Sequence, residues 1–102
     1  MNISKTVENG KVTIKPDGWL DTASSPELGS VIESVEEAES IVLDFENVEY
    51  MSSAGLRQVI AANKKAKSLN AEFEVVNVGT EVMNIFKMTV IDKKINIKEK
   101  AE

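Results

Sequence analysis

Residues 40–57 read Ser-Ile-Val-Leu-Asp-Phe-Glu-Asn-Val-Glu-Tyr-Met-Ser-Ser-Ala-Gly-Leu-Arg. The first part, residues 40–45, is a nearly unbroken apolar run of strand length, typical of a central strand covered on both faces. Apolar residues then recur at helical spacing after Ser52 and Ser53, so a helix is expected to begin there. We therefore expect a buried strand that leads through a connecting segment into a helix, as in a parallel sheet flanked by helices.

The chain before this stretch predicts a hairpin. Residues 3–7 and 11–15 are strand-like runs on either side of Asn9-Gly10, a dipeptide that tolerates the positive φ angles of a tight turn. Residues 16–18, Pro-Asp-Gly, are expected to end the second strand.

A helix is expected between the hairpin and the buried strand. Ser25 offers a capping hydroxyl and Pro26 suits the first turn of a helix. Apolar residues then follow at helical spacing, and the remaining face is acidic. The apolar positions are Leu28, Val31, Ile32 and Val35, and the acidic ones are Glu33, Glu36, Glu37 and Glu39.

The second half of the chain continues the alternation of helices and strands. The helix after Ser53 is expected to bury one stripe, residues 72–78 alternate like a strand, and residues 81–88 suggest a short helix before a last strand at 94–97. The buried stripe is expected to hold Leu56, Val59, Ile60, Asn63, Ala66 and Leu69. These elements predict one α/β domain over residues 1–102, a mixed β-sheet flanked by helices, with its core over 3–97 and a frayed end at 98–102.

Composition excludes several classes of protein. The 102 residues include no cysteine and no histidine, so thiol and imidazole catalysis and the usual zinc, haem and iron–sulfur sites are not expected. The net charge of −5 argues against direct nucleic-acid binding. No segment has the roughly 20 apolar residues of a membrane span, and the amino terminus lacks the features of a signal peptide. We therefore expect a cytoplasmic protein without a cofactor or metal, for which much of ordinary enzyme chemistry is excluded.

Charge is unevenly distributed along the chain. Between Lys15 and Arg57 every charged residue is acidic, and from Arg57 to Lys67 every one is basic. The simpler interpretation is two solvated helix faces of opposite sign. The alternative is a docking surface, and a partner on the first helix would then need a basic surface.

Ser52 and Ser53 are candidates for both a structural and a regulatory role. One of them is expected to cap the helix, a contribution of roughly 1 kcal/mol that needs no function. The same position suits a phosphoserine, because the added charge of about −1.5 to −2 would face free N–H groups and the positive end of the helix dipole. Arg57, one turn later, could compensate that charge or be a solvated cation.

Two segments resemble the STAS domain family, the fold of bacterial anti-sigma factor antagonists. The resemblance runs from about residue 10 to 97. The main segment consists of Asp44, Phe45, Val48, Tyr50, Met51, Ser52, Ser53, Ala54, Gly55, Leu56 and Arg57. The second segment is Gly18, Trp19, Leu20, Asp21 and Thr22, followed by Pro26, Glu27 and Leu28.

The resemblance implies a small non-enzymatic switch protein that binds an anti-sigma factor, often itself a serine kinase, and thereby regulates transcription. Phosphorylation by that partner turns binding off, and a serine phosphatase restores it. The chain departs from the family at Ala54, where many members carry the acceptor hydroxyl, so Ser53 becomes the first choice of acceptor and Ser52 the second. The partner-binding residues implied are Gly18, Asp21, Met51, Ser52, Ser53, Ala54, Gly55, Leu56 and Arg57.

Two other functions stay open. The Ala54 departure also fits a STAS subunit bound permanently in a larger signalling or transporter-associated assembly, without phosphoregulation. An enzyme or nucleotide-binding domain is disfavoured, because no Gly-rich phosphate loop is present.

A few further residues have simpler interpretations. Trp19 is expected to cover a core edge rather than form an exposed contact. A metal site is not expected from Asp17, Asp21 and Asp44, because their spacing matches no calcium loop. Three residues are expected to pack under the last helix, namely Met83, Phe86 and Met88.

Overall fold

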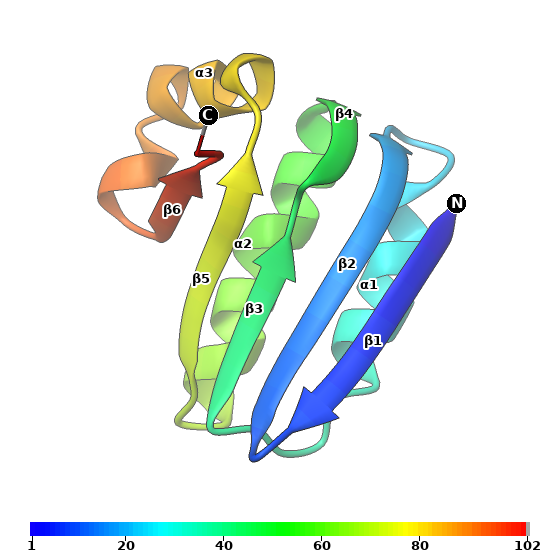
Figure 1. The fold of residues 1–102 in the computed structure, drawn as a ribbon, viewed down its shortest axis with the longest axis vertical. Coiled ribbons are helices and arrows are strands. Elements are labelled where there is room, and N and C mark those ends of the chain that lie inside the picture. Colours follow the sequence, from blue (N-terminus) through cyan, green and yellow to red (C-terminus); the bar gives the residue numbers. More distant parts are fainter. Residues whose placement is uncertain (102) are drawn as a thin grey trace.

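The computed structural model describes residues 1–101 and forms one mixed sheet with helices against it (Figure 1). Its elements are β1 (Asn2–Glu8), β2 (Lys11–Leu20), α1 (Ser25–Glu33), β3 (Ser40–Asp44), β4 (Asn47–Met51), α2 (Ser53–Ser68), β5 (Glu72–Val78), α3 (Thr80–Met88), a 3-10 turn η1 (Ile91–Lys93) and β6 (Asn96–Glu99). The strands lie in the order β1-β2-β3-β5-β6, and β4 pairs with the end of β2. β1 and β2 are antiparallel and the other pairs are parallel.

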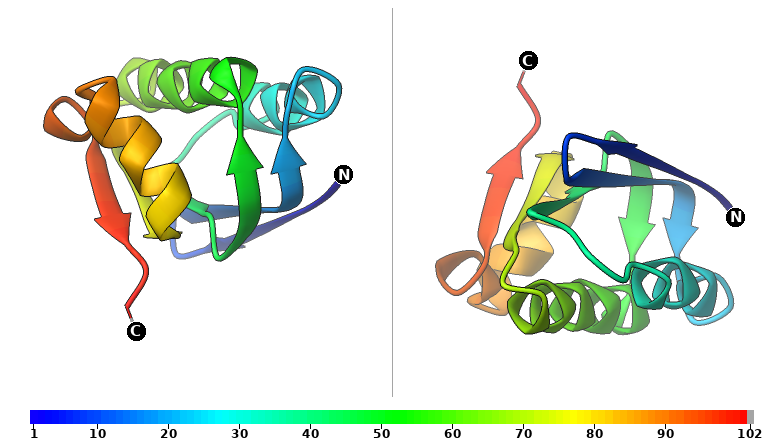
Figure 2. Two further views of the ribbon diagram at one scale, coloured as in Figure 1. Left: turned by 90° about the horizontal axis from the view of Figure 1, so that it is seen from above. Right: turned by 90° about the horizontal axis from the view of Figure 1, so that it is seen from below.

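The helices occupy two positions around this sheet. α1 and α2 lie side by side on one face (Figure 2), whereas α3 lies near the carboxyl ends of β5 and β6 (Figure 1). The predicted α/β class with a mixed, helix-flanked sheet is confirmed. In the part of the chain that the structure describes, no helix is long and apolar enough to cross a membrane.

The hairpin and the central strand are confirmed. Asn9 and Gly10 both have positive φ, and β1 pairs with β2 from Glu8 opposite Lys11 onward. β3 lies between β2 and β5, with its three central residues Ile41–Leu43 all buried.

The prediction that Pro-Asp-Gly ends the second strand is wrong. β2 continues to Leu20, because its partner on one side changes along its length. β3 pairs with residues 11–14 and β4 with residues 17–20, so Pro16 lies between them and has a partner only in β1. Proline, which has no N–H to donate, is tolerated at such a gap in the ladder.

The segment between the central strand and α2 forms a strand that its sequence pattern did not predict. Residues 47–51 make β4, which pairs in parallel with the end of β2. Burial falls only on Val48 and Met51, so the strand lacks the simple alternation that would have revealed it.

The first helix is shorter than expected and begins one residue away from the expected cap. Ser24, not Ser25, is the N-cap, and Ser25 is a buried residue of the helix. The helix ends at Glu33, which leaves Glu36, Glu37 and Glu39 in the connection to β3. Here the carbonyl of Gly10 accepts the N–H groups of residues 39 and 40, which pulls this connection toward the hairpin.

α2 buries a narrower stripe than expected. Val59 and Ala66 are buried as predicted, together with Gly55 and Ala62, which were not among the predicted positions. Four predicted positions are only half-buried, namely Leu56, Ile60, Asn63 and Leu69. Small residues face the sheet on this helix, and their size allows α2 to lie close to it.

The carboxyl-terminal part also differs in detail. β5 lies where predicted, and α3 begins at Thr80, one residue before the predicted start. β6 covers Asn96–Glu99 rather than 94–97, and the N–H of Lys100 donates to the carbonyl of Val78 at 2.8 Å. Ordered pairing thus extends beyond Ile97, where the sequence predicted fraying; Glu102 lies outside the described residues.

Packing under α3 is partly as predicted. Met83 and Phe86 are buried, and the Phe86 ring stacks on Phe45 with centroids 6.4 Å apart. Met88 is 82% exposed, so its predicted packing is wrong.

Candidate functional site

The predicted site residues come from two chain segments that end at the same edge of the sheet. β2 runs into the loop before α1, and β4 runs directly into α2 (Figure 1). Because β2 and β4 are parallel neighbours, their carboxyl ends and the starts of both helices lie together. Ligands of open α/β sheets bind at this kind of edge.

The carbonyl of Leu20 joins the two segments. It accepts the N–H of Ser52 at 2.8 Å and the Ser52 hydroxyl at 3.2 Å. The Ser52 Oγ also accepts the N–H of Ala54 at 3.2 Å, which is the geometry of an N-cap. Ser52 is therefore the capping serine, and its hydroxyl is engaged on both sides.

Ser53 has a different environment from its neighbour. It is the first residue of α2 and is exposed, and within residues 1–101 its hydroxyl forms no hydrogen bond. Arg57, one turn later, is also exposed and forms no ion pair in the described chain. A hydroxyl and a cation at i and i+4 thus face solvent on successive turns at the start of the helix.

Gly55 marks a close approach of α2 to the sheet. A Cβ built at this position would lie 2.8 Å from the Leu20 Cβ, 2.9 Å from the Leu20 carbonyl oxygen and 2.7 Å from the Met51 Cγ. Backbone and buried atoms cannot easily yield that space, so the glycine lets α2 pack against β2 and β4. Met51 and Gly55 are themselves buried and support the surface instead of forming it.

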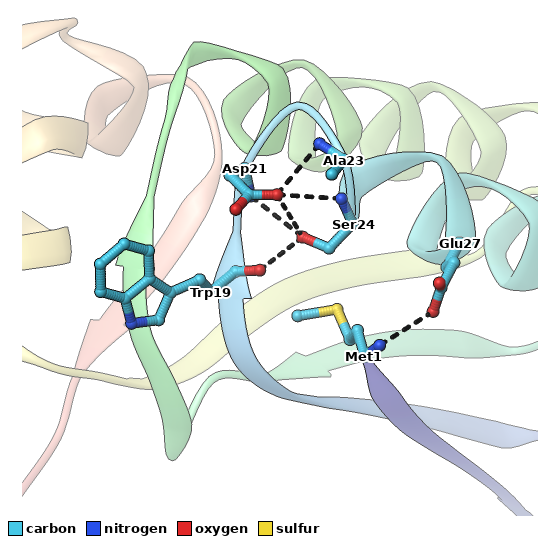
Figure 3. A network of polar contacts seen from close by, with 6 residues as sticks. All are labelled: Met1, Trp19, Asp21, Ala23, Ser24 and Glu27. Atoms are coloured by element: carbon cyan, nitrogen blue, oxygen red, sulfur yellow. Dashed lines mark hydrogen bonds and ion pairs between the residues drawn. The ribbon is translucent and has the colours of Figure 1, made fainter.

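The loop after β2 is held by a network of hydrogen bonds (Figure 3). The Asp21 carboxylate accepts the N–H groups of Ala23 and Ser24, both at 3.0 Å, and the Ser24 hydroxyl donates to the carbonyl of Trp19. The hydrogen bonds that Ser24 donates, chiefly from its backbone N–H and then from its hydroxyl, hold the pKa of Asp21 below its usual value. Asp21 thus orders the loop, and its carboxylate is already occupied by N–H donors.

Trp19 and Tyr50 form an exposed aromatic pair beside this loop. Their ring centroids are 5.1 Å apart with an interplanar angle of 44°, and the residues are 58% and 44% exposed. The expectation that Trp19 covers a core edge is therefore wrong. Tyr50 was not a predicted site residue; alternation from the buried Val48 would place it inside, and only the β-bulge between β2 and β4 turns it outward.

The remaining predicted site residues and the nearby charges complete the picture. Gly18, Ala54 and Leu56 are half-buried. Lys15 pairs with Glu46 at 3.0 Å, and this hydrogen bond raises the pKa of the lysine. In residues 1–101 no group of three or more acidic side chains could hold a metal ion. The groove between α1 and α2, about 790 Å³ in volume, is lined by none of the predicted site residues.

Comparison with known proteins gives a consistent result. The family model described as "STAS domain" matches residues 2–102. A curated relative, the anti-sigma-B factor antagonist of Staphylococcus aureus (strain NCTC 8325 / PS 47), is 26% identical over 104 residues, which cover 100% of this chain and 96% of the relative.

Solved structures share the fold at lower identity. An anti-sigma factor antagonist from Mycobacterium paratuberculosis has a TM-score of 0.86 and 23% identity, covering 95% of this chain and 84% of the other. The Bacillus cell fate determinant SpoIIAA in its phosphorylated form has a TM-score of 0.74 and 16% identity, covering 94% and 90% of the two chains. At these identities the likeness is one of fold.

Proposed function

This chain belongs to the STAS domain family, and from that premise we propose that it is an anti-sigma factor antagonist whose binding to its partner is switched off by phosphorylation of Ser53. The observation that carries the proposal is the exposed Ser53 hydroxyl on the first turn of α2, beside a neighbour that already caps the helix. The partner is an anti-sigma factor that is also a serine kinase, and a serine phosphatase reverses the switch. Regulation of this kind acts on transcription in the cytoplasm.

The relatives support the class of function. The Staphylococcus aureus relative, matched over nearly its whole length, is named an anti-sigma-B factor antagonist. SpoIIAA, which shares the fold, has been solved in a phosphorylated form. Nothing in the proposed role asks this chain to supply catalytic groups, because a kinase partner brings the nucleotide and the base.

The choice of Ser53 over Ser52 rests on hydrogen bonding. Phosphorylation of Ser52 would remove the hydroxyl proton that it donates to the carbonyl of Leu20. That change would break one of the two hydrogen bonds that link Ser52 to β2 and would place a dianion beside a carbonyl oxygen. Ser53 can take a phosphate without losing any hydrogen bond within residues 1–101, so the fold would tolerate the modified state.

The phosphate would act on the interface rather than on the fold. It would carry about −1.5 to −2 charges at the positive end of the α2 dipole, within reach of Arg57. Arg57 would then pair with the phosphate instead of a partner group. A partner that covers this turn would also have to desolvate the new charge, and both effects weaken binding.

Co-purification from the native cell, followed by mass spectrometry, identifies the partner. Incubation of the purified pair with ATP should then add one phosphate to Ser53, and Ser53→Asp should weaken partner binding by about tenfold or more. Ser53→Ala should bind normally and resist phosphorylation, while Ser52→Ala serves as the matched control that keeps the acceptor.

Absence of phosphate on both serines, with unchanged affinity of Ser53→Asp, would refute the switch. A stable complex insensitive to kinase and phosphatase would instead support the permanently bound subunit suggested by Ala54.

A further inference from the structure

The exposed aromatic pair Trp19–Tyr50 is set in place by specific backbone features. β2 and β4 pair Gly18 with Val48 and then Trp19 with Tyr50, so one extra residue, Glu49, lies in β4 at this point. Gly18 has a φ of +112°, a conformation that side-chain-bearing residues rarely adopt. This bulge is what brings the two rings to the same exposed side, since bulges re-aim side chains.

The backbone behind the rings is held on both sides. The Trp19 carbonyl accepts the hydroxyl of Ser24, and the next carbonyl, of Leu20, accepts the N–H of Ser52. The two rings are therefore presented from ordered strands, which lowers the entropy lost when they are covered. Exposed Trp and Tyr held in this way are typical anchors of protein interfaces.

Acidic residues adjoin the pair on both strands: Asp17 lies two positions before Trp19 on β2, and Glu49 is the bulge residue directly before Tyr50 on β4. Asp17 on β2 and Glu49 on β4 are exposed and form no ion pair in the described chain. Of the nearby cations, Lys15 pairs with Glu46 at 3.0 Å, and Lys100, which lines the same hollow as Glu49, donates to the carbonyl of Glu46. The surface therefore joins two aromatic rings to exposed carboxylates that form no ion pair in the described chain, which together favour a cation over an apolar group.

We propose that Trp19, Tyr50 and Glu49 form the docking site for an arginine side chain on the partner protein. The guanidinium would stack on an aromatic face and donate to a carboxylate, which a lysine or an apolar side chain does less well. The identity of the partner as an anti-sigma factor rests on the proposed function, whereas the chemistry of the docking site does not. The interface then has two parts, an acidic aromatic part that attracts the partner and the Ser53–Arg57 turn that phosphorylation switches.

A peptide titration tests the chemistry without the partner. A pentapeptide with two arginines is added to the ¹⁵N-labelled full chain and compared with the same peptide carrying citrulline, the uncharged isostere. The chain has one tryptophan, so its indole N–H signal is assigned directly. The arginine peptide should shift the indole and the Tyr50 amide with an affinity about fivefold or more above that of citrulline. Equal shifts by both peptides, or stronger binding of a leucine peptide, would overturn the proposal.

Variants localise the effect. Tyr50→Ala and Glu49→Gln should each weaken arginine-peptide binding, whereas Tyr50→Phe, which keeps the ring, and Met88→Ala, an exposed residue elsewhere, should not. Unchanged amide spectra away from the substitution show that each variant is folded. Binding that survives both Tyr50→Ala and Glu49→Gln would refute the site.

Measurements with the co-purified partner separate this proposal from the phosphorylation switch. Trp19→Ala should weaken partner binding by about fivefold or more while leaving Ser53 a kinase substrate. If Ser53→Asp abolishes binding and Trp19→Ala does not change it, the docking site is wrong and the switch stands. If Trp19→Ala weakens binding and Ser53→Asp does not, the docking site stands and the switch is wrong.

Discussion

The start of α2 and the aromatic pair lie at the same edge of the sheet, but they are built in different ways. At the start of α2, Ser52 caps the helix and Gly55 lets it touch Leu20, so most of the segment serves packing and only Ser53 and Arg57 are free. At the aromatic pair, Trp19 and Tyr50 leave much of their surface in solvent, at the cost of a bulge in the ladder. Residues that hold the fold together and residues that are available to a partner therefore lie within a few positions of each other.

The largest effect is expected where the helix touches the strand. Gly55→Ala should lower the free energy of unfolding by about 2–3 kcal/mol, because the new Cβ would overlap the Leu20 backbone. Urea unfolding measures this loss of stability. Gly29→Ala is the matched control, since its Cβ would meet only the flexible end of Gln58, and its cost should be smaller. Equal costs at both glycines would contradict the close approach at Gly55.

Removing the cap should have an intermediate effect. Ser52→Ala should cost about 1 kcal/mol of stability, because the N–H of Ala54 loses its acceptor. Ser53→Ala should change stability by less than about 0.5 kcal/mol, because its hydroxyl is free in the described chain. Thermal or urea unfolding of the two variants shows which serine stabilises the fold. A larger loss of stability for Ser53→Ala than for Ser52→Ala would mean that Ser53 is the capping serine.

A smaller, pH-dependent effect is expected in the loop that supports Trp19. The pKa of Asp21 is lowered by the bonds from Ser24, so its charge stabilises the fold above the unfolded-state pKa, and this stabilisation is lost as pH falls through the folded-state value. Asp21→Asn keeps an acceptor oxygen but no charge. The stability difference between the two proteins, measured by urea unfolding at pH 7 and at pH 3, should therefore shrink at the lower pH. A difference that grows on acidification would contradict this role.

The smallest effect on stability is expected at the aromatic pair itself. Tyr50→Phe should leave the free energy of unfolding within about 0.5 kcal/mol of the original, because the Tyr50 hydroxyl forms no hydrogen bond in residues 1–101. Urea unfolding measures this change. Phe86→Leu, a substitution in the buried core, is the control that shows how large the loss of stability is for a core residue. A cost at Tyr50 as large as that at Phe86 would mean that the pair is part of the core and not a display surface.

Much of the fold could be predicted because its signals are local. The Asn9-Gly10 turn, the apolar run at 41–43 and the helix start at Ser52 and Ser53 each depend on neighbouring residues, and all three are confirmed. Other features depend on distant partners. Pro16 lies within a strand because β3 and β4 share one side of β2, and β4 forms only because β2 is there to pair with it.

For the site, the sequence by itself determined the positions of the two serines, the glycine and the arginine around the start of α2. Only the tertiary structure decided which serine is engaged and which is free, because the engaged one bonds to Leu20, 32 residues away. It also decided that Trp19 and Tyr50 face solvent together, since their register depends on how β2 pairs with β4. Local propensity thus sets where an element begins, whereas exposure depends on what another part of the chain covers.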